Sequence, residues 1–216
     1  MRIPIAREGY PFILISLVCV LAVWIAGLPW LEVLFVPVSF FVIAFFRDPE
    51  RVIPAGNDSI VSPADGRIIK IERLKEGKFR LENALKISIF MNVFNVHVNR
   101  APASGKVVDI IYNKGRFFSA NLDKASLENE QNALILEDAA GKVFAFNQIA
   151  GLIARRIVCH AKVGMNLAKG ERFGMIRFGS RVDVFLPASC RVAVNAGDKV
   201  QAGSSILGYW ENSHAG

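Results

Sequence analysis

A glycine followed by a serine, Gly179-Ser180, is the pair of residues in this chain whose types offer a specific reaction. A serine hydroxyl can attack the carbonyl of the residue before it and move the acyl group from nitrogen to oxygen. Glycine at the preceding position does not obstruct that attack, because it has no side chain. A simple turn is the alternative for any Gly-Ser pair, and a second pair, Gly203-Ser204, shows that the dipeptide alone decides nothing.

The residues on either side of the first pair predict that it lies at a bend or at a junction between strands. Arg172–Phe178 is rich in large apolar residues, whereas Arg181–Leu186 alternates charged with apolar residues. Alternation with a period of two is typical of a strand with one buried face, and it places Arg181 and Asp183 on the other face. The second pair falls in an Ala-Gly-Ser-Ser turn that we expect to be exposed, where the geometry for attack would rarely form.

One histidine and one aspartate stand in segments that could support such an attack. His97 lies in the alternating segment Phe94–Arg100, where its imidazole is either a general base near neutral pH or a structural residue. Asp65 lies in Ser62–Arg67, and Asp-Gly is by itself a common hairpin turn. The cysteines and the other histidines are scattered and contain no CxxC pair, so we predict a reducing compartment, no disulfide framework and no metal site.

The composition restricts the partners of the chain. It has 216 residues, a net charge of +7 and 52% hydrophobic residues. A basic protein binds nucleic acid, an anionic membrane or an anionic substrate. The charges form no long run, and the sequence contains neither a recognition helix nor zinc-finger spacing, so we predict no nucleic-acid partner.

Residues 12–46 form one apolar block near the N-terminus. Its first part, Phe12–Leu28, has 17 residues without a charge. As a helix this part would be about 26 Å long, just short of a hydrocarbon core of about 30 Å. Pro29 and Trp30 interrupt the block, and Leu31–Phe46 would be shorter still. We therefore predict a helical hairpin that crosses or dips into a membrane, with a signal peptide and a buried helix pair as the alternatives.

Arginines flank both ends of this block, at positions 2 and 7 before it and at positions 47 and 51 after it. A hairpin places both flanks on the same side of a membrane, and positive flanks favour the cytoplasm. We therefore expect the protein at the cytoplasmic face of the cell membrane. Residues 1–51 would be the anchor and linker, and residues 52–216 a β-rich catalytic domain.

Short runs of β-branched and aromatic residues, separated by turn residues, predict that strands dominate from Val52 onward. Such spacing is typical of a sandwich or barrel. Residues 196–208 are similar to the hairpin edges of lipoyl and biotinyl domains, although the carrier lysine motif is missing. The fold class that we predict is mainly β and barrel-sandwich-like, preceded by the apolar helical hairpin, with a short helix or loop at Leu122–Gln131. The predicted strands are Gly66–Ile71, Ala84–Phe90, Lys106–Tyr112, Ala133–Glu137 and Lys142–Ile149, followed by the two runs that flank Gly179-Ser180.

Several of these segments combine into a pattern that covers most of the chain. In order they are Phe46–Pro49, Ser62–Gly66, Asn95–Arg100, Gln148–Gly151 with Ala154–Ile157, and Gly170–Pro187. Each motif is weak alone, but the ordered set resembles the phosphatidylserine decarboxylase family in its short, membrane-associated form.

The resemblance implies that the chain cuts itself between Gly179 and Ser180 and turns Ser180 into a covalent pyruvoyl group. Asp65, His97 and Ser180 would form a triad like that of serine proteases for this cut. The products would be a large chain, 1–179, and a small chain, 180–216, which stay together as a heterodimer. The pyruvoyl carbonyl would form a Schiff base with the serine amine of an anionic phospholipid and act as the electron sink for decarboxylation.

The chain departs from the longer bacterial members of this family at Phe94, where those members carry a second histidine. We therefore expect that another donor or a water supplies the proton, with His97 after its release from processing as the first candidate. Arg177 and Arg181, which flank the expected cut, could attract the lipid phosphate or be solvated strand residues.

Two alternative functions fit the same sequence. Because ester and ether lipids share the head group, decarboxylation of archaetidylserine is one of them. The other is a non-enzymatic, membrane-anchored adaptor with a barrel-sandwich fold, which would stay a single chain on a denaturing gel.

Overall fold

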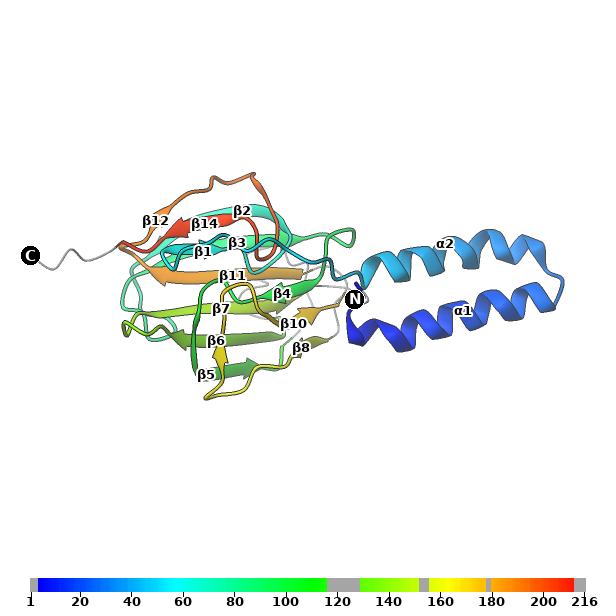
Figure 1. Ribbon diagram of the computed structural model, residues 1–216, viewed down its shortest axis with the longest axis horizontal. Helices are drawn as coiled ribbons and strands as arrows, with labels where there is room; N and C mark the ends of the chain where they lie inside the picture. Colours follow the sequence, from blue (N-terminus) through cyan, green and yellow to red (C-terminus); the bar gives the residue numbers. More distant parts are fainter. Residues whose placement is uncertain (1–3, 116–128, 152–155, 178–179, 212–216) are drawn as a thin grey trace, which may run out of the picture. The chain divides into compact units, whose positions relative to one another are not determined.

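The computed structural model describes residues 4–115, 129–151, 156–177 and 180–211. The chain divides into two compact units, Met1–Glu50 and Arg51–Gly216, the first helical and the second built of strands (Figure 1). The helices are η1 (Arg7–Gly9), α1 (Tyr10–Ile25) and α2 (Pro29–Phe45). The strands are β1 (Ser59–Val61), β2 (Gly66–Leu74), β3 (Ala84–Met91), β4 (Val98–Arg100), β5 (Gly105–Asn113), β6 (Gln131–Glu137), β7 (Val143–Ala150), β8 (Ile157–Cys159), β9 (Asn166–Leu167), β10 (Arg172–Ile176), β11 (Ser180–Pro187), β12 (Arg191–Val192), β13 (Lys199–Val200) and β14 (Ile206–Tyr209).

The two long helices form a hairpin with a tight turn at one end and a backbone contact at the other. Gly27 has a φ of +65° in the turn, and Pro29 lies at the start of α2, where its missing N–H is not needed. At the base, the Ala6 N–H donates to the Phe46 carbonyl at 2.8 Å. The predicted break of the apolar block at Pro29 is thus confirmed.

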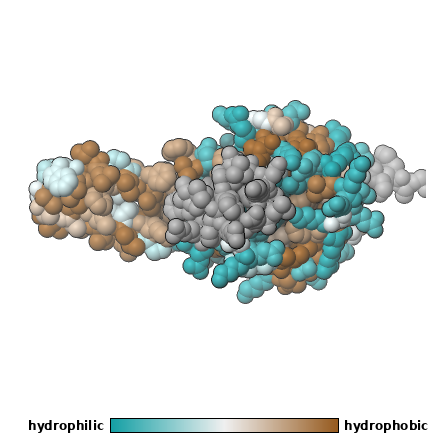
Figure 2. Space-filling model, turned by 180° about the vertical axis from the view of Figure 1, so that it is seen from behind, coloured by the Kyte–Doolittle hydropathy of each residue, from teal (hydrophilic) through white to brown (hydrophobic). Residues whose placement is uncertain are grey.

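This hairpin exposes apolar side chains that a water-soluble unit would bury. Trp24 is 67% exposed and Val33 is 77% exposed, and Figure 2 shows apolar side chains over most of the hairpin surface. Among the described residues, one helix, Arg7–Ile25, is long and apolar enough to cross a membrane, and α2 is shorter. Only 6% of the apolar window in the longer helix is buried, which favours the predicted anchor over the alternative of a helix pair buried in a core.

The second unit is organised by one eight-stranded sheet in the order β13-β2-β3-β11-β7-β6-β5-β9. The sheet curls into a half-barrel, and two three-stranded sheets, β1-β14-β12 and β4-β10-β8, complete the unit (Figure 1). All the described strand pairs are antiparallel. The predicted mainly β, barrel-sandwich-like fold after an apolar helical hairpin is confirmed. The short helix or loop predicted at Leu122–Gln131 falls mostly outside the described residues, which resume at position 129. Its last residue, Gln131, begins β6.

Strand β11 lies in the middle of this sheet and is buried on both faces. Val182, Val184 and Leu186 point into the main apolar core, as the alternation predicts. Phe185 belongs to a second, smaller core on the opposite face, where the Phe79 ring packs edge-on against it with centroids 4.9 Å apart. The prediction of a strand with one buried face is therefore wrong, because the loop after β2 covers the second face.

The charged residues of β11 pair with each other in this buried position. Arg181 Nε lies 2.6 Å from Asp183 Oδ1, and both side chains are 1% exposed. Arg181 also donates to Ser88 Oγ at 3.0 Å, and Lys86 Nζ lies 3.7 Å from Asp183 Oδ2. Residues two apart in a strand share a face, so the period of two itself brings Arg181 and Asp183 together.

The segment around Asp65 also differs from its simplest interpretation. Asp65-Gly66 does not close a hairpin, because the strands that flank it pair elsewhere: β1 pairs with β14, and β2 pairs with β3 and β13. A side chain at Gly66 would lie 2.2 Å from the Phe90 carbonyl oxygen, so glycine permits a close approach of two strands here. The Ser62–Arg67 segment is a crossing from one sheet to another.

Breaking the pair on β11 should destabilise the second unit strongly. Arg181→Met leaves the Asp183 carboxylate buried without its closest partner, which should lower the free energy of unfolding by about 3–5 kcal/mol. Arg181→Met combined with Asp183→Leu should recover most of this loss. Urea unfolding measures both effects, with Arg73→Met at the exposed end of β2 as the control. If Arg181→Met costs no more than the control, the pair does not stabilise this face.

Candidate active site

Ser180 is the first residue of β11 and lies where the chain passes from one sheet to another. β10 ends at Ile176 in a three-stranded sheet, and β11 begins at Ser180 in the eight-stranded sheet. Ser180 pairs with Met91 on one side and Ala150 on the other. The predicted strand junction is confirmed for the serine, whereas Gly179 lies outside the described residues.

The Ser180 hydroxyl is fully buried and weakly held. Its side chain is 0% exposed, and Oγ donates to Met91 Sδ at 3.3 Å. A thioether sulfur is a poor acceptor, so little is lost if the hydroxyl proton moves to a better one. The hydroxyl is therefore kept away from water without being committed to a strong partner.

The second Gly-Ser pair lies in the turn between β13 and β14. Gly203 is buried, with a φ of +76°, and Ser204 is half-buried, with its N–H donating to the Gln201 carbonyl at 3.2 Å. The expected turn is confirmed, but the expected exposure is wrong. What separates the two serines is that Ser180 is locked into the middle of the main sheet.

His97 lies just before β4 and is also fully buried. Its Nδ1 is 2.9 Å from the Asn95 carbonyl oxygen. A carbonyl only accepts, so Nδ1 carries a proton in this bond. In the neutral ring with Nδ1 protonated, Nε2 carries the lone pair, which is the form that a general base requires.

The carboxylate of Asp65 is held by Arg51. Arg51 donates one nitrogen to both oxygens of Asp65, at 3.0 and 2.8 Å, and the Ala202 N–H donates to Oδ1 at 2.8 Å. Arg51 and Asp65 are 12% and 11% exposed at their side chains. In the expected triad Asp65 would hold Nδ1 of His97, but in this structure the Asn95 carbonyl fills that role.

A buried cluster brings the three candidate segments together at the end of β3. Asn99 on β4 directs its amide nitrogen toward Met91 Sδ at 3.8 Å and the Pro63 carbonyl at 3.4 Å. Because Met91 also accepts from Ser180, the Asp65 segment, the strand after His97 and the start of β11 share one small region.

Three buried side-chain amides behind this region form a chain. Gln148 Nε2 donates to Asn99 Oδ1 at 2.9 Å, and Asn132 Nδ2 donates to Gln148 Oε1 at 3.0 Å. Each of these bonds fixes the orientation of the next amide. This gives a physical reason for the Gln148–Gly151 motif: its glutamine orients the asparagine that lies against Met91.

A pocket of about 580 Å³ opens beside Asp65. Phe90 and Asn92 line it, and Met91 between them is the residue paired with Ser180. The pocket therefore adjoins the strand next to the candidate nucleophile. The polar side chains of Arg67, Asn95, Lys199 and Gln201 line the same pocket.

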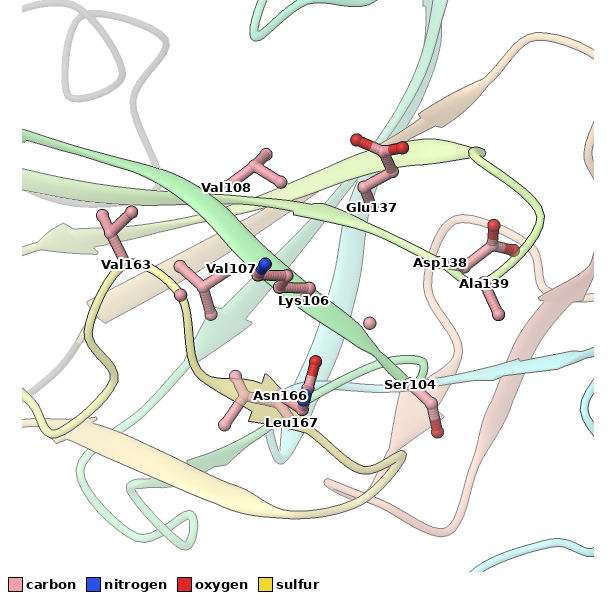
Figure 3. Close-up of a pocket in the computed structure, with 12 residues that line it drawn as sticks. Ser104, Lys106, Val107, Val108, Glu137, Asp138, Ala139, Val163, Asn166 and Leu167 are labelled. Carbon is pink, nitrogen blue, oxygen red and sulfur yellow. The ribbon is translucent and has the colours of Figure 1, made fainter.

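A larger pocket of about 810 Å³ lies at the far end of the sheet, between β5, β6 and β9 (Figure 3). Its residue Glu137 ends β6, whereas Gln131 at the other end of β6 is the residue near the Ser180 end of β11. Six residues of strand separate these ends, or about 20 Å. None of the candidate catalytic residues lines this pocket, so we assign it no part in the chemistry.

The two arginines expected near the lipid phosphate are not equivalent. Arg181 is buried and its guanidinium donates to Asp183 and Ser88, so it is committed to these partners and is not a solvated strand residue. Arg177 is half-buried, and its N–H donates to the Arg156 carbonyl at 3.3 Å.

The thiols of Cys159 and Cys190 do not add a nucleophile. Burial raises the pKa of Cys190 to about 12, and burial also raises the pKa of Cys159 above its ordinary value. Both are therefore protonated near neutral pH. In the described parts of the chain no group of three or more His, Cys, Asp or Glu side chains is placed to hold a metal ion.

Comparison with known proteins identifies the family. Residues 38–208 match the family model described as phosphatidylserine decarboxylase. A phosphatidylserine decarboxylase proenzyme from Aromatoleum aromaticum is 53% identical over 204 residues, which cover 94% of each chain. Those from Syntrophus aciditrophicus and Ralstonia nicotianae are 52% and 51% identical, covering 94% of this chain and 96% and 94% of their own. The chain therefore belongs to the phosphatidylserine decarboxylase family of lyases.

Proposed function

We propose that the chain converts phosphatidylserine to phosphatidylethanolamine with a pyruvoyl group made from Ser180, after cutting itself between Gly179 and Ser180. The observation that carries the proposal is the state of Ser180, whose buried hydroxyl begins the central strand and is held only by a weak thioether contact among its described bonds. The names of the relatives, which call those proteins proenzymes, support a precursor that is processed.

In the first step His97 Nε2 takes the proton of Ser180 Oγ, while the Asn95 carbonyl holds Nδ1–H and so keeps the ring in the required tautomer. The Ser180 oxygen attacks the Gly179 carbonyl carbon, and the C–N bond of the amide breaks as the C–O bond of an ester forms, while the imidazolium returns the proton to the leaving nitrogen. Loss of the Ser180 Cα proton then breaks the Cβ–O bond. The chain that ends at Gly179 leaves with a free carboxylate, and residue 180 becomes dehydroalanine.

Water then adds to residue 180 and ammonia leaves, which produces the pyruvoyl group. Burial of Ser180 suits this group, because an exposed carbonyl would react with other amines. When present, the group supplies an electron sink for the electron pair left behind by carbon dioxide. The phenyl ring of Phe94 has no acidic proton to donate. We therefore assign the protonation of the substrate carbon to His97 Nε2.

Asp65 acts through position and charge. Its carboxylate, fixed by Arg51 and Ala202, places a negative charge in the region where an imidazolium forms. A fixed charge of opposite sign stabilises that cation even without a direct bond. Arg51 is therefore a positioning residue for Asp65.

The strand pairing supports a stable complex of the two products. β11 would carry the new N-terminus, and it pairs with β3 and β7, which belong to the other chain. We also place the protein at the cytoplasmic face of the membrane that holds its lipid substrate, with the apolar helical hairpin, which includes the long helix Arg7–Ile25, as the anchor.

The cut itself is tested with two serine variants. The wild-type chain should yield a large fragment ending at residue 179 and a small fragment that resists Edman degradation and is lighter than its serine-started form by one ammonia. Ser180→Ala should abolish both cleavage and decarboxylation, because no other residue can form the carbonyl. Ser204→Ala is the matched control and should change neither. An intact single chain with full activity would end the pyruvoyl hypothesis.

Removal of Arg51 tests the role of Asp65. Arg51→Ala should slow self-cleavage about ten- to a hundredfold, the loss expected for a charged hydrogen bond of about 1.5–3 kcal/mol. Arg51→Lys should cleave itself at a rate between those of the wild type and Arg51→Ala, since lysine cannot bind both oxygens in the same geometry. Cleavage is followed on a denaturing gel with Arg47→Ala as the control. Faster cleavage in Arg51→Ala would mean that Arg51 holds Asp65 away from His97.

A shortened chain tests the anchor. A chain beginning at Arg47 retains Arg51 and should fold and cleave itself. It should act on a soluble short-chain phosphatidylserine but lose most of its activity on bilayers, because the substrate is no longer concentrated around it. If this chain is insoluble or uncleaved, the apolar block belongs to the core of the enzyme.

A further inference from the structure

The pocket beside Asp65 is rich in hydrogen-bond donors. Asn92 Oδ1 accepts from the Phe94 N–H, and Asn95 Oδ1 accepts from the Asn92 N–H, both at 2.9 Å. Gln201 Oε1 accepts from Arg51 at 3.0 Å. Backbone N–H groups and guanidinium groups can only donate, so the orientation of each amide is fixed. Each of these three side chains therefore has its NH₂ group left to offer a ligand.

Two cations stand directly opposite each other at the edge of the same pocket. Arg67 on β2 pairs in register with Lys199 on β13, and both side chains are exposed. Like charges at directly opposite positions of an antiparallel pair destabilise it. Within the part of the chain that the structure describes, neither cation has an acidic partner. An anion bound between them would remove this repulsion.

The carboxylate in the pocket opposes such an anion only in part. Asp65 accepts from Arg51 on both oxygens and from the Ala202 N–H, so the guanidinium offsets part of its repulsion of an anion. Val200, which is buried, and Phe90 supply an apolar part of the wall. The pocket thus combines two unbalanced cations, three amide donors and an apolar side, which suits a phosphodiester attached to glycerol.

We infer that Arg67 and Lys199 bind the phosphate of the lipid head group. The inference rests on the proposed function and adds the site that places the substrate. The phosphate keeps its charge throughout the reaction, whereas the serine carboxylate becomes neutral carbon dioxide. Strong cations on the carboxylate would stabilise the ground state more than the transition state and slow the reaction. The phosphate is therefore the anion that this pair can bind without cost to the rate.

This assignment replaces the role that the sequence suggested for Arg181, whose guanidinium is committed to Asp183. Arg67 and Phe90 are register neighbours, and Phe90 is in turn the register neighbour of Arg181. The phosphate site is therefore displaced along the sheet toward its β13 edge, where the cations can reach solvent and the lipid.

The test compares two double variants of the full chain in mixed micelles of detergent and phosphatidylserine. Arg67→Ala/Lys199→Ala should raise KM about ten- to a hundredfold, as expected for losing charge-assisted bonds, with kcat within about twofold. Arg73→Ala/Lys75→Ala is the matched control. Arg73 lies near the other end of β2, about 20 Å from Arg67, and Lys75 follows that strand. This control therefore also removes two positive charges, but away from the pocket, and it should leave KM unchanged. Arg67→Lys/Lys199→Arg keeps both charges and should restore KM.

Self-cleavage on a denaturing gel separates this inference from the proposed function. All these variants should cleave completely, so an uncleaved but active wild type would refute the pyruvoyl proposal alone. A cleaved double variant with wild-type KM would overturn the phosphate site, and so would a double variant that fails to cleave, since the pair would then act in maturation. Glycerophosphoserine should inhibit the wild type and not the double variant. Equal inhibition by inorganic phosphate would make this a free-phosphate site and overturn the head-group assignment.

Discussion

Strand β11 is hydrogen-bonded along both edges, with eight residue pairs to β3 and six to β7. This ladder fixes the position of its first residue, Ser180, far more firmly than a loop could. It also sets which groups surround the serine, because the ends of β3 and β7 bring Met91 and Ala150 beside it. The amide chain through Gln148 and Asn99 then orients the polar groups behind that point. Each part of the candidate site is placed by its relation to this one strand.

Placing a strand in the middle of a curled sheet buries both of its faces, and charge has to be balanced accordingly. The Arg181–Asp183 pair does this on one face, with Lys86 shared between Asp183 and Glu72. Burial raises the pKa of Glu72, but the hydrogen bonds and charges of Lys86 and Lys70 more than offset this and hold its pKa below the ordinary value. At the other end of the site Arg51 balances Asp65. Among the described residues no acidic side chain balances Arg67 and Lys199 in this way, which is why we infer a ligand site there.

The sequence was sufficient for the features that depend on local pattern. The apolar block, its break at Pro29 and the main strands follow from hydropathy and period, and the family follows from ordered motifs. Features that depend on contacts distant in sequence could not be predicted. Alternation suggested that this face of β11 meets solvent, since nothing local reveals that Phe79 packs against Phe185 on it or that Arg181 is buried. Arg51 looked like a flanking charge of the anchor, and Asp65-Gly66 looked like a hairpin turn. Only the three-dimensional structure shows that Arg51 and the Ala202 N–H both donate hydrogen bonds to Asp65.

The position of Ser180 at the first rung of the ladder has a consequence for how such a protein persists. A cut before this residue would leave a central strand that belongs to a separate polypeptide, held by backbone hydrogen bonds, apolar contacts and the polar contacts of Arg181 and Asp183 with β3. Unfolding would then release two molecules, and reassembly would depend on their concentration and on a strand that has lost its covalent tether. The lifetime of the mature enzyme would be governed by the rate of unfolding rather than by an equilibrium. The uncut chain would be the form that folds, and the mature enzyme would persist because a kinetic barrier makes its unfolding slow.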